Sequence, residues 1–547
     1  MPATLTYPGV YVEEIPSGVH TITGVATSIT AFIGQADRGP IDEAFVINSF
    51  GDYERNFGGL SLNSTMSFAV RDFYLNGGSK AVIVRVSNGA ATARAKLATA
   101  SVSPANPDPP GDNLFLDASS PGSWGNNLSV LIDHNTKDKN SSNPDASLFN
   151  VTIFETNPVT NQVTASEKFL NVSVNPANVR FIAKVLEQGS ALMRVPVDNA
   201  GAYLMPNVRP DETVTVVSPP TSPPTPDKPT AVKASGGSDG LDVAEAQFIG
   251  TGMAGDKRGL YALEKADLFN LLCIPPFTAT NDITPALVGE AAVYCEKRRA
   301  MMIVDPPSSW TTKKTAVDQF SDATTDFVGT RSNNSAIYFP RLRQPNPLRE
   351  NQIEDFAPCG AVAGVMARTD SQRGVWKAPA GQEASLIGVP QLSVSLTDDE
   401  NGELNPLGVN CLRAFPIIGR VVWGARTLEG ADQLASEWKY IPIRRTALYI
   451  EESLYRGTKW VVFEPNDEPL WAQIRLNVGS FMHDLFRQGA FQGKTPRDAY
   501  LVKCDKETTT QSDIDHGIVN IVVGFAPLKP AEFVILKIQQ LAGQIET

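Results

Sequence analysis

The chain has 547 residues, and 59 Asp or Glu against 47 Lys or Arg give it a formal net charge of −12. This acidity argues against a free nucleic-acid binder, because such proteins need Lys and Arg to neutralise phosphates. With 42% hydrophobic and 19% charged residues, the composition is typical of a globular protein of roughly three or four domains.

The cysteines indicate neither a disulfide framework nor a zinc site. They are five, an odd number, and no two form a CxxC pair, so we expect free core residues in a reducing compartment: Cys273, Cys295, Cys359, Cys411 and Cys504. The first residues lack the features of a signal peptide, and no apolar run reaches the roughly 18 residues of a membrane span. We therefore expect a protein that is made in a cytoplasm, is not exported by a signal peptide and has no direct membrane insertion.

Residues 1–23 are predicted to form a linker arm. Pro2, Pro8 and Pro16 disfavour a helix, whereas Val10, Val12 and Ile15 are spaced as in a strand. A terminal segment of this kind cannot bury itself alone. It is either disordered or adds a strand to another sheet.

Residues 24–90 read as a compact α/β unit. The pattern predicts strands at 26–33, 44–47 and 80–86, and helices from Ser49 to Phe57 and from Ser64 to Asn76. Ser49 is a plausible N-cap, and Asn76-Gly77-Gly78 ends the second helix.

Residues 91–235 are predicted to form a mainly β insertion at the periphery. An Ala-rich helix candidate follows Asn88, and short β-like runs follow at 128–132, 150–155 and 213–217. The stretch 218–229 contains PPTSPPTPDKP, which is typical of a semi-rigid linker.

Residues 236–405 alternate strands and helices, which favours a middle α/β domain with a largely parallel sheet. We predict strands at 269–274, 301–304 and 336–339, and helices at 285–299 and 360–369. Gly250–Gly255 matches GxGxxG after a strand-like 246–249. The acidic residue that a dinucleotide site needs about 20 residues on is absent, so a tight glycine turn is the preferred reading.

Residues 406–530 form the last predicted domain, and 531–547 a C-terminal linker strand. Strands are expected at 417–423, 438–443, 460–463, 518–525 and 532–541, and helices at 444–455 and 468–489. The second helix has an apolar stripe of Trp471, Ile474, Val478, Phe481 and Leu485, with Arg475, Asn477 and Arg487 off it.

No set of catalytic residues emerges. The four histidines lie far apart, and Asp398-Asp399-Glu400 is better read as a solvated turn than as a metal site. Arg444-Arg445 could bind phosphate, but an ion pair with Glu451 or Glu452 is preferred. We expect no enzyme activity, no cofactor and no bound metal.

Several stretches of this chain stand out as motifs: WKYIPIRRT at 438–446, YIEES at 449–453, KWVVFEPND at 459–467, PAEFV at 530–534 and, at the N-terminus, YPGVYVEE at 7–14. In these stretches the chain resembles contractile tail sheath proteins, the building blocks of phage tails and related injection machines. The resemblance covers residues 7–88 and about 245–541. It leaves the β insertion outside.

The resemblance implies a structural subunit that stacks in hexameric rings as a helical homo-oligomer around an inner tail tube. Contraction of the rings drives the tube through a target envelope. The implied partners are further copies, the tube protein, and baseplate and tail terminator or cap proteins, with no nucleic acid. It also implies a place in a virion tail or a phage-tail-like particle, and a C-terminal domain completed by strands exchanged between subunits.

Two groups of residues are predicted to make these contacts. Linker strands are expected to include Val10, Tyr11, Val12 and Glu13 at one end and Phe533, Val534, Ile535 and Leu536 at the other. Basic residues of the last domain could face an acidic tube: Arg475, Arg487, Lys494 and Arg497. The alternatives are that the C-terminal strand pairs with 518–525 in its own chain, that residues 241–405 form a nucleotide-binding enzyme, or that the chain is a non-contractile tail or shell component.

Overall fold

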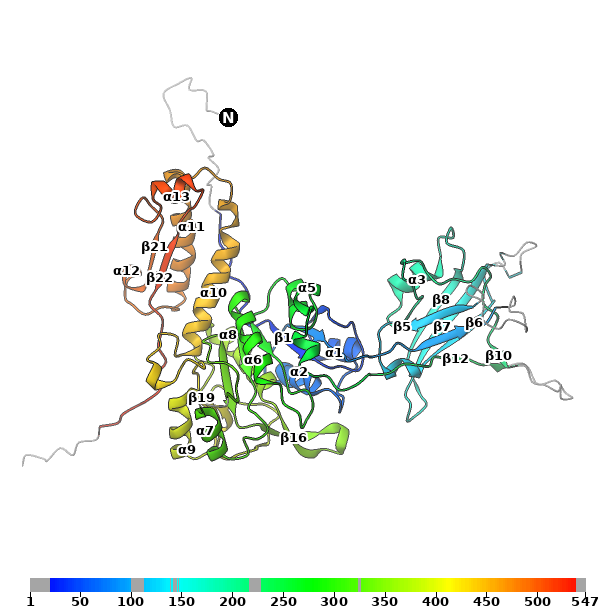
Figure 1. Cartoon of the computed structure of the whole chain (residues 1–547), viewed down its shortest axis with the longest axis horizontal. Helices are drawn as coiled ribbons and strands as arrows, with labels where there is room; N and C mark the ends of the chain where they lie inside the picture. The colour runs from blue at the N-terminus through cyan, green and yellow to red at the C-terminus, as the bar shows by residue number, and fades with distance from the viewer. Residues whose placement is uncertain are drawn as a thin grey trace, which may run out of the picture.

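An eight-stranded sheet forms the centre of the protein (Figure 1). The computed structural model describes residues 20–99, 113–137, 139–140, 145, 147–215, 228–322 and 326–537. In spatial order the strands are β2 (Ala44–Ile47), β3 (Ala81–Arg85), β1 (Thr30–Gly34), β13 (Leu271–Cys273), β14 (Met301–Val304), β15 (Ser335–Phe339), β19 (Val409–Phe415) and β20 (Gly419–Val422). The six inner strands are parallel, and β2 and β20 are antiparallel edge strands.

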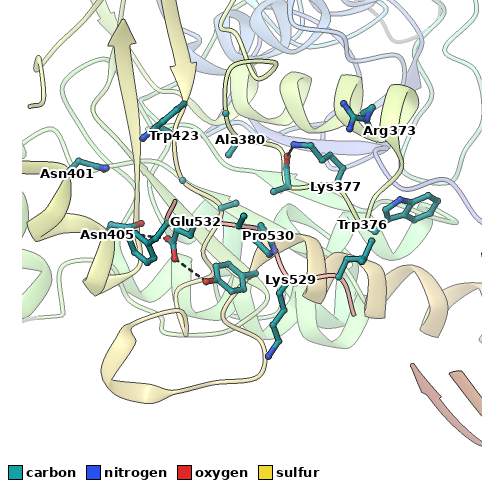
Figure 2. A pocket seen from close by; sticks show the side chains of 18 of the residues that line it. Arg373, Trp376, Lys377, Ala380, Asn401, Asn405, Trp423, Lys529, Pro530 and Glu532 are labelled. Carbon is teal, nitrogen blue, oxygen red and sulfur yellow. Dashed lines mark hydrogen bonds between the residues drawn. The ribbon is translucent and has the colours of Figure 1, made fainter. Parts of the chain in front are cut away.

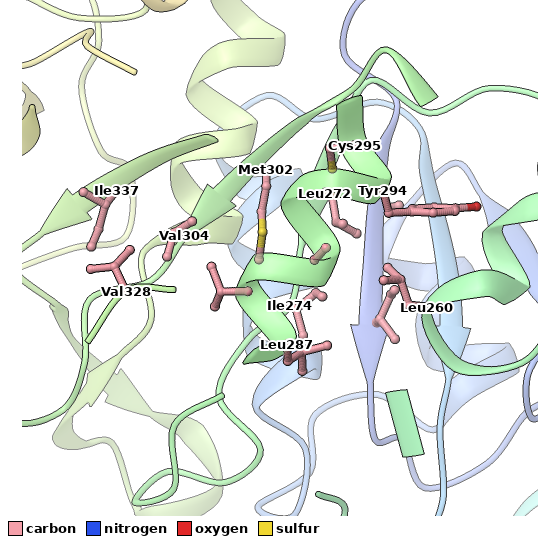
Figure 3. Packing of buried hydrophobic residues seen from close by; sticks show 14 of the residues in the cluster. Leu260, Leu272, Ile274, Leu287, Tyr294, Cys295, Met302, Val304, Val328 and Ile337 are labelled. Carbon is pink, nitrogen blue, oxygen red and sulfur yellow. The ribbon is translucent and has the colours of Figure 1, made fainter. Parts of the chain in front are cut away.

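Both faces of this sheet are covered, so successive residues of one strand enter two different cores. Met302 and Val304 of β14 join one apolar cluster, whereas Met301 and Ile303 join the other. Figure 3 shows the first cluster, where α6 (Pro285–Arg298) packs on β13 and β14. The helix α7 (Lys313–Ser321) and the 3-10 turn Gly259–Lys265 complete this face. The opposite face carries α1 (Phe50–Phe57), α2 (Thr65–Leu75) and α8 (Cys359–Arg373).

The helices α2 and α8 approach closely because α8 has glycine where they cross. A Cβ atom on Gly360 would lie 2.0 Å from the carbonyl oxygen of Ala69, and one on Gly364 would lie 2.5 Å from that of Phe73. The small-residue character of this segment therefore reflects backbone contact between two helices.

A second unit, with its own core, lies to the right in Figure 1. It contains two main antiparallel sheets, one of β12 (Val232–Lys233), β6 (Leu128–Asp133), β7 (Leu148–Thr156) and β8 (Val163–Ser173), the other of β4 (Arg94–Leu97), β5 (Leu114–Ala118) and β9 (Met193–Arg194). It also includes α3 (Ile182–Gly189) and the pair β10 (Val214–Thr215) with β11 (Lys228–Pro229).

The chain enters and leaves this insertion side by side. Isolated bridges join Asn88 to Leu241 and Ala91 to Ser238. The loop after β1 holds the insertion in place: Arg38 forms an ion pair with Glu155 at 3.2 Å, and the N–H of Gly39 donates to Ser120 Oγ at 2.9 Å.

A third unit, which we name the lobe, comprises residues 441–527 and lies at the upper left of Figure 1. Its elements are α10 (Ile441–Gly457), α11 (Glu468–Arg487), α12 (Pro496–Ala499), β21 (Tyr500–Lys503), α13 (Gln511–Asp515) and β22 (Val522–Phe525). Around the sheet, short elements complete the chain: α4 (Ala246–Ile249), α5 (Met253–Asp256), α9 (Asp398–Leu404), and a small sheet of β16 (Leu342–Asn346), β17 (Gln352–Phe356) and β18 (Gln391–Leu392).

The structure corrects the predicted division of the chain. The ranges 24–90, 236–405 and the start of 406–530 all contribute strands to the central sheet, although the sequence predicted a separate middle domain at 236–405 and a separate last domain from 406 on. The physical reason is that parallel strands pair with neighbours far away in the sequence, so one sheet gathers separate segments.

Five local predictions were also wrong. Asp398-Asp399-Glu400, read as a solvated turn, is the first turn of helix α9. The Ala-rich segment predicted as a helix contains β4, and the strand-like 246–249 is helix α4. Predicted strand 438–443 runs into α10, because Pro442 suits the first turn and Ile441 and Ile443 face the core. Predicted strand 460–463 is a 3-10 turn and a chain reversal.

Asp305 is a buried carboxyl beside a cavity of about 210 Å³ at the carboxyl ends of β13 and β14. Its Oδ1 accepts from the N–H of Cys359 at the start of α8, at 2.8 Å, and Oδ2 has no hydrogen-bond partner among the described residues. Burial raises the pKa of Asp305 to about 6. Since this lies above the ordinary value of 3.8, the folded protein binds the proton more tightly than the unfolded chain. The carboxyl therefore lowers stability as the pH rises through this window.

Asp305→Asn is therefore expected to stabilise the protein at pH 7.5. The amide oxygen can still accept from Cys359, while the buried charge is gone. We expect a gain of about 2 kcal/mol, or about 4 °C in the midpoint of thermal unfolding, with little change at pH 4. Asp484→Asn, at an exposed position, is the control. A lower midpoint for Asp305→Asn at pH 7.5 would contradict the prediction.

Candidate subunit-linking site

The lobe contains a sheet of only two strands. β21 and β22 are antiparallel, with Tyr500 opposite Phe525 and Lys503 opposite Val522. Beside them α11 has its stripe Trp471, Ile474, Val478, Phe481 and Leu485 buried, as predicted, and Asp467 is its N-cap. Within the described residues each strand pairs only with the other. The outer edge of each therefore offers backbone N–H and C=O groups to a further strand.

The first described residues run along the lobe toward the central sheet. His20 stacks on Trp460 with 4.3 Å between ring centres, and its N–H donates to Asn477 Oδ1 at 3.2 Å. Ile22 is buried against Gly457, and the N–H of Val25 donates to Ser453 Oγ at 3.2 Å. Asn477, predicted to lie off the apolar stripe, is thus a buried contact of this segment.

A buried ion pair joins this path to the central sheet. Arg445 and Asp370 approach to 2.6 Å, with side-chain exposures of 3% and 4%, and Arg445 also donates to the carbonyl oxygen of Thr27 at 3.0 Å. Arg444 pairs with Glu451 at 3.3 Å, as the sequence predicted for this tandem. The partner of Arg445 differs from the prediction because the two neighbours on a helix point to different sides.

Glu532 anchors the segment that leaves the lobe after β22. Its carboxylate forms a bidentate ion pair with Arg426, with 2.7 Å from Arg426 Nε to Oε1 and 2.8 Å from Arg426 Nη2 to Oε2. Asn405 Nδ2 donates to Oε1 at 2.8 Å, and the hydroxyl of Tyr440 donates to Oε2 at 3.0 Å. Burial alone would raise the pKa of Glu532, but hydrogen bonds from Arg426 and Asn405 and the charge of Arg426 outweigh it, so the pKa is lowered.

Past this anchor the chain exposes apolar side chains. Phe533, Val534, Ile535 and Leu536 are 73–82% exposed, and residues 532–537 form no strand in this chain. The alternative that they pair with 518–525 is not seen for these residues: residues 532–537 form no strand, and the partner of β22 is β21. Residues 538–541 of the predicted strand, and Val10, Tyr11, Val12 and Glu13, lie outside the described residues.

The two anchors lie at opposite ends of the lobe (Figure 1). His20 contacts Trp460 near the connection between α10 and α11, whereas Glu532 contacts Tyr440 just before α10 begins. A helix of 17 residues such as α10 spans about 25 Å. The two terminal segments therefore leave the lobe in places where they can meet different neighbours.

The predicted tube-facing residues do not form one patch. Arg475 is held within the chain by Glu468 at 2.6 Å and by the carbonyl oxygen of Cys504. Arg487 lies twelve residues further on, about 18 Å along the helix. It is exposed, as are Lys494 and Arg497 around α12.

The described residues contain no group of three or more His, Cys, Asp or Glu placed to hold a metal, and none of their helices has the length and apolarity of a membrane span. Gly252 opens the four-residue helix α5 and follows helix α4, whereas the GxGxxG motif follows a strand. The cavity at the carboxyl ends of the strands is lined by Asp282 and Asp305, which would repel a phosphate. All five cysteines are free and buried, as expected for core residues.

Comparison with known families identifies the class of protein. The profile of the phage tail sheath protein central domain matches residues 252–428, and that of the phage tail sheath C-terminal domain matches residues 434–540. These regions together make up just over half of the chain. The chain belongs to the phage tail sheath protein family.

Individual relatives agree with this assignment. The tail sheath protein of Vibrio phage KVP40 is 26% identical over 178 residues, 32% of this chain and 25% of that protein. That of Enterobacteria phage T4 is 23% identical over 188 residues, 34% of this chain and 27% of that protein. The matched region thus spans about a quarter of the length of these relatives. The fold is similar to that of the anti-feeding prophage helical sheath in its contracted state, with a TM-score of 0.56, 22% identity, and coverage of 98% of this chain and 100% of that chain.

Sequence reasoning missed the anchor formed by Arg426, Asn405 and Glu532. Glu532 stood within the recognised PAEFV stretch, but only its apolar neighbours were considered as contact residues. An arginine in the apolar stretch VVWGARTL is the one signal that could have pointed to a buried acidic partner.

Proposed function

We propose that this chain is a sheath subunit that polymerises around an inner tube and contracts to drive that tube through a target envelope. One observation carries the proposal: a lobe with two open sheet edges holds two terminal segments that leave at its opposite ends. These features support a subunit that donates its terminal segments to neighbours and accepts theirs at its own sheet edges, as a mesh of identical copies requires.

Strand addition suits this task physically. Main-chain hydrogen bonds to a neighbour's sheet edge persist even when the side-chain contacts between subunits change. The chain beside the added strand can bend as the angle between the two subunits changes. A two-stranded sheet is marginal alone and gains from further strands. We propose that residues 9–15 of one subunit and 532–541 of another complete the β21–β22 sheet of a third.

Contraction requires subunits that rotate against each other without separating. The energy is stored when the sheath assembles in an extended lattice, and the contracted lattice must gain contacts. No nucleotide is consumed in this scheme. The proposed partners are further copies of the chain, the tube protein, and baseplate and terminator or cap proteins, in a particle assembled in a bacterial cytoplasm.

Negative-stain images of particles formed with the tube protein test the proposal. We expect long thin tubes and short wide ones, with conversion from the first to the second on mild denaturation. Tubes of one diameter under all conditions would indicate a static tail or shell component. Absence of tubes would refute a sheath role.

Basic residues at the end of α11 and around α12 are proposed to face the tube. Arg487, Lys494 and Arg497 are exposed, whereas Arg475 is engaged within the chain. Reversal of these three exposed residues to Glu is expected to weaken assembly on an acidic tube about tenfold at low salt and less at high salt. Lys168→Glu in the insertion is the control, and equal loss at both salt concentrations would contradict the assignment.

The insertion is expected to be dispensable for tube formation. Its entry and exit strands are adjacent at Ala91 and Ser238, and it has its own core. Replacement of residues 92–237 by two glycines should therefore leave a folded subunit that still assembles, as electron microscopy can verify. Soluble subunits that no longer form tubes would show that the insertion takes part in the lattice.

A further inference from the structure

The loop between α10 and α11 presents an aromatic side chain to solvent. Val462 is 62% exposed and Phe463 is fully exposed, and Glu464 follows them at the surface. Phe463 has a backbone φ of 71°, in the left-handed region that bulky residues rarely adopt. We name residues 462–464 the apex loop. The exposed apolar side chains and the left-handed backbone of this loop both cost free energy in the isolated subunit. Such features are typical of contact sites.

The apex loop rests on a fixed base. Asn466 accepts a hydrogen bond from Trp471 Nε1 at 2.9 Å and donates one to the carbonyl oxygen of Ile518 at 2.9 Å. Pro465 restricts the backbone in between. The loop thus holds Phe463 outward, so that binding costs little of the conformational entropy that a mobile loop would lose.

A cleft of about 650 Å³ lies at the opposite end of the lobe, beside the Glu532 anchor (Figure 2). We name it the basal cleft. Trp376, Trp423 and Ala380 supply apolar surface, and Lys377 and Lys529 supply positive charge. Among the described residues, neither lysine forms an ion pair with an acidic side chain, and Glu464 of the apex loop forms none with a basic side chain.

We propose that the apex loop of one subunit inserts into the basal cleft of the next, with Phe463 against the tryptophans and Glu464 beside the two lysines. The proposal rests on the proposed function, since it assumes that copies assemble. The apex loop and the basal cleft match in chemistry. Both carry aromatic side chains, and the loop carries an acidic side chain where the cleft carries basic ones. They lie at opposite ends of one lobe, so the contact is head-to-tail. Such contacts close into a ring when the rotation between neighbours permits it and otherwise build a helical array.

Tube formation by the double variant Phe463→Ala/Glu464→Lys tests this contact. Both side chains are exposed, so the variant is expected to fold as monomer, while its tube yield falls about tenfold. Adding Lys377→Glu and Lys529→Glu should restore part of the yield by exchanging the charges. Glu507→Lys, an exposed position on the same lobe, is the matched control.

Cross-linking identifies the neighbour directly. In tubes of Phe463→Cys/Ala380→Cys, oxidation is expected to give a ladder of covalent oligomers, and each single variant should give none. A double variant that forms normal tubes without a ladder would overturn the inference. So would a Phe463→Ala/Glu464→Lys chain that assembles like the wild type. Wild-type chains that form no tubes would refute the proposed function itself.

Discussion

A chain that lacks residues 1–18 is expected to remain folded and soluble and to form no tubes. The cut leaves in place His20, Ile22 and Val25, which fix the segment on the lobe. It removes the predicted strand at residues 9–15, whose proposed acceptor is the open edge of a neighbour's sheet. Thermal unfolding of the subunit should be unchanged, while electron microscopy should show no tubes.

A longer deletion, of residues 1–27, is the informative comparison. It also removes Ile22, which is only 7% exposed, and the stacking of His20 on Trp460, so we expect a loss of about 2 kcal/mol in lobe stability. If the shorter deletion lowers thermal stability as much as the longer one, residues 1–18 stabilise their own subunit. Normal contractile tubes from the shorter deletion would refute the linking role.

Predictions that depend on short sequence windows were confirmed. Strands β2 and β14 begin and end at the residues that their short apolar runs predicted, and Ser49 caps α1 as expected. Caps and apolar periodicity are local, since each depends on a few adjacent residues and their hydrogen bonds.

Predictions that depend on distant partners were less complete. Ile441 and Ile443 have strand-forming side chains, yet they begin α10, where both are buried and Pro442 suits the first turn. No local pattern shows that Arg426 finds Glu532, since the pair spans 106 residues. For the candidate site, the sequence thus named the terminal segments but neither the anchor of the second one nor the open edges they are proposed to meet.

Glu532→Ala is expected to destabilise the isolated subunit. The guanidinium of Arg426 is 1% exposed, and the substitution removes the carboxylate that binds it at two points. Asp432 remains at 3.0 Å from Arg426, so part of the charge stays paired. We expect a loss of about 2–3 kcal/mol, toward the lower end for a broken buried pair. Thermal unfolding of the unassembled subunit at pH 7.5 measures it.

The pH dependence of the stability difference between wild type and Glu532→Ala shows whether Glu532 stabilises the subunit by its charge or by its packing. The pKa of Glu532 is lowered below its ordinary value of 4.5, so its stabilising effect is present above pH 4.5 and is lost as the pH falls through the lowered value. Wild type and Glu532→Ala should therefore converge in stability once the pH falls below the lowered pKa of Glu532. A constant difference across this range would assign the effect to packing.

Phe533→Ala is the matched variant one residue beyond the anchor. Phe533 is 73% exposed, so its removal should leave the unfolding midpoint of the subunit unchanged. Its side chain is proposed to reach a neighbouring subunit, and the variant should therefore form fewer tubes. Glu532 would then act within the subunit and Phe533 between subunits. An assembly defect in Glu532→Ala without loss of subunit stability would contradict this division, because it would place the Glu532 contact in the lattice and not in the lobe.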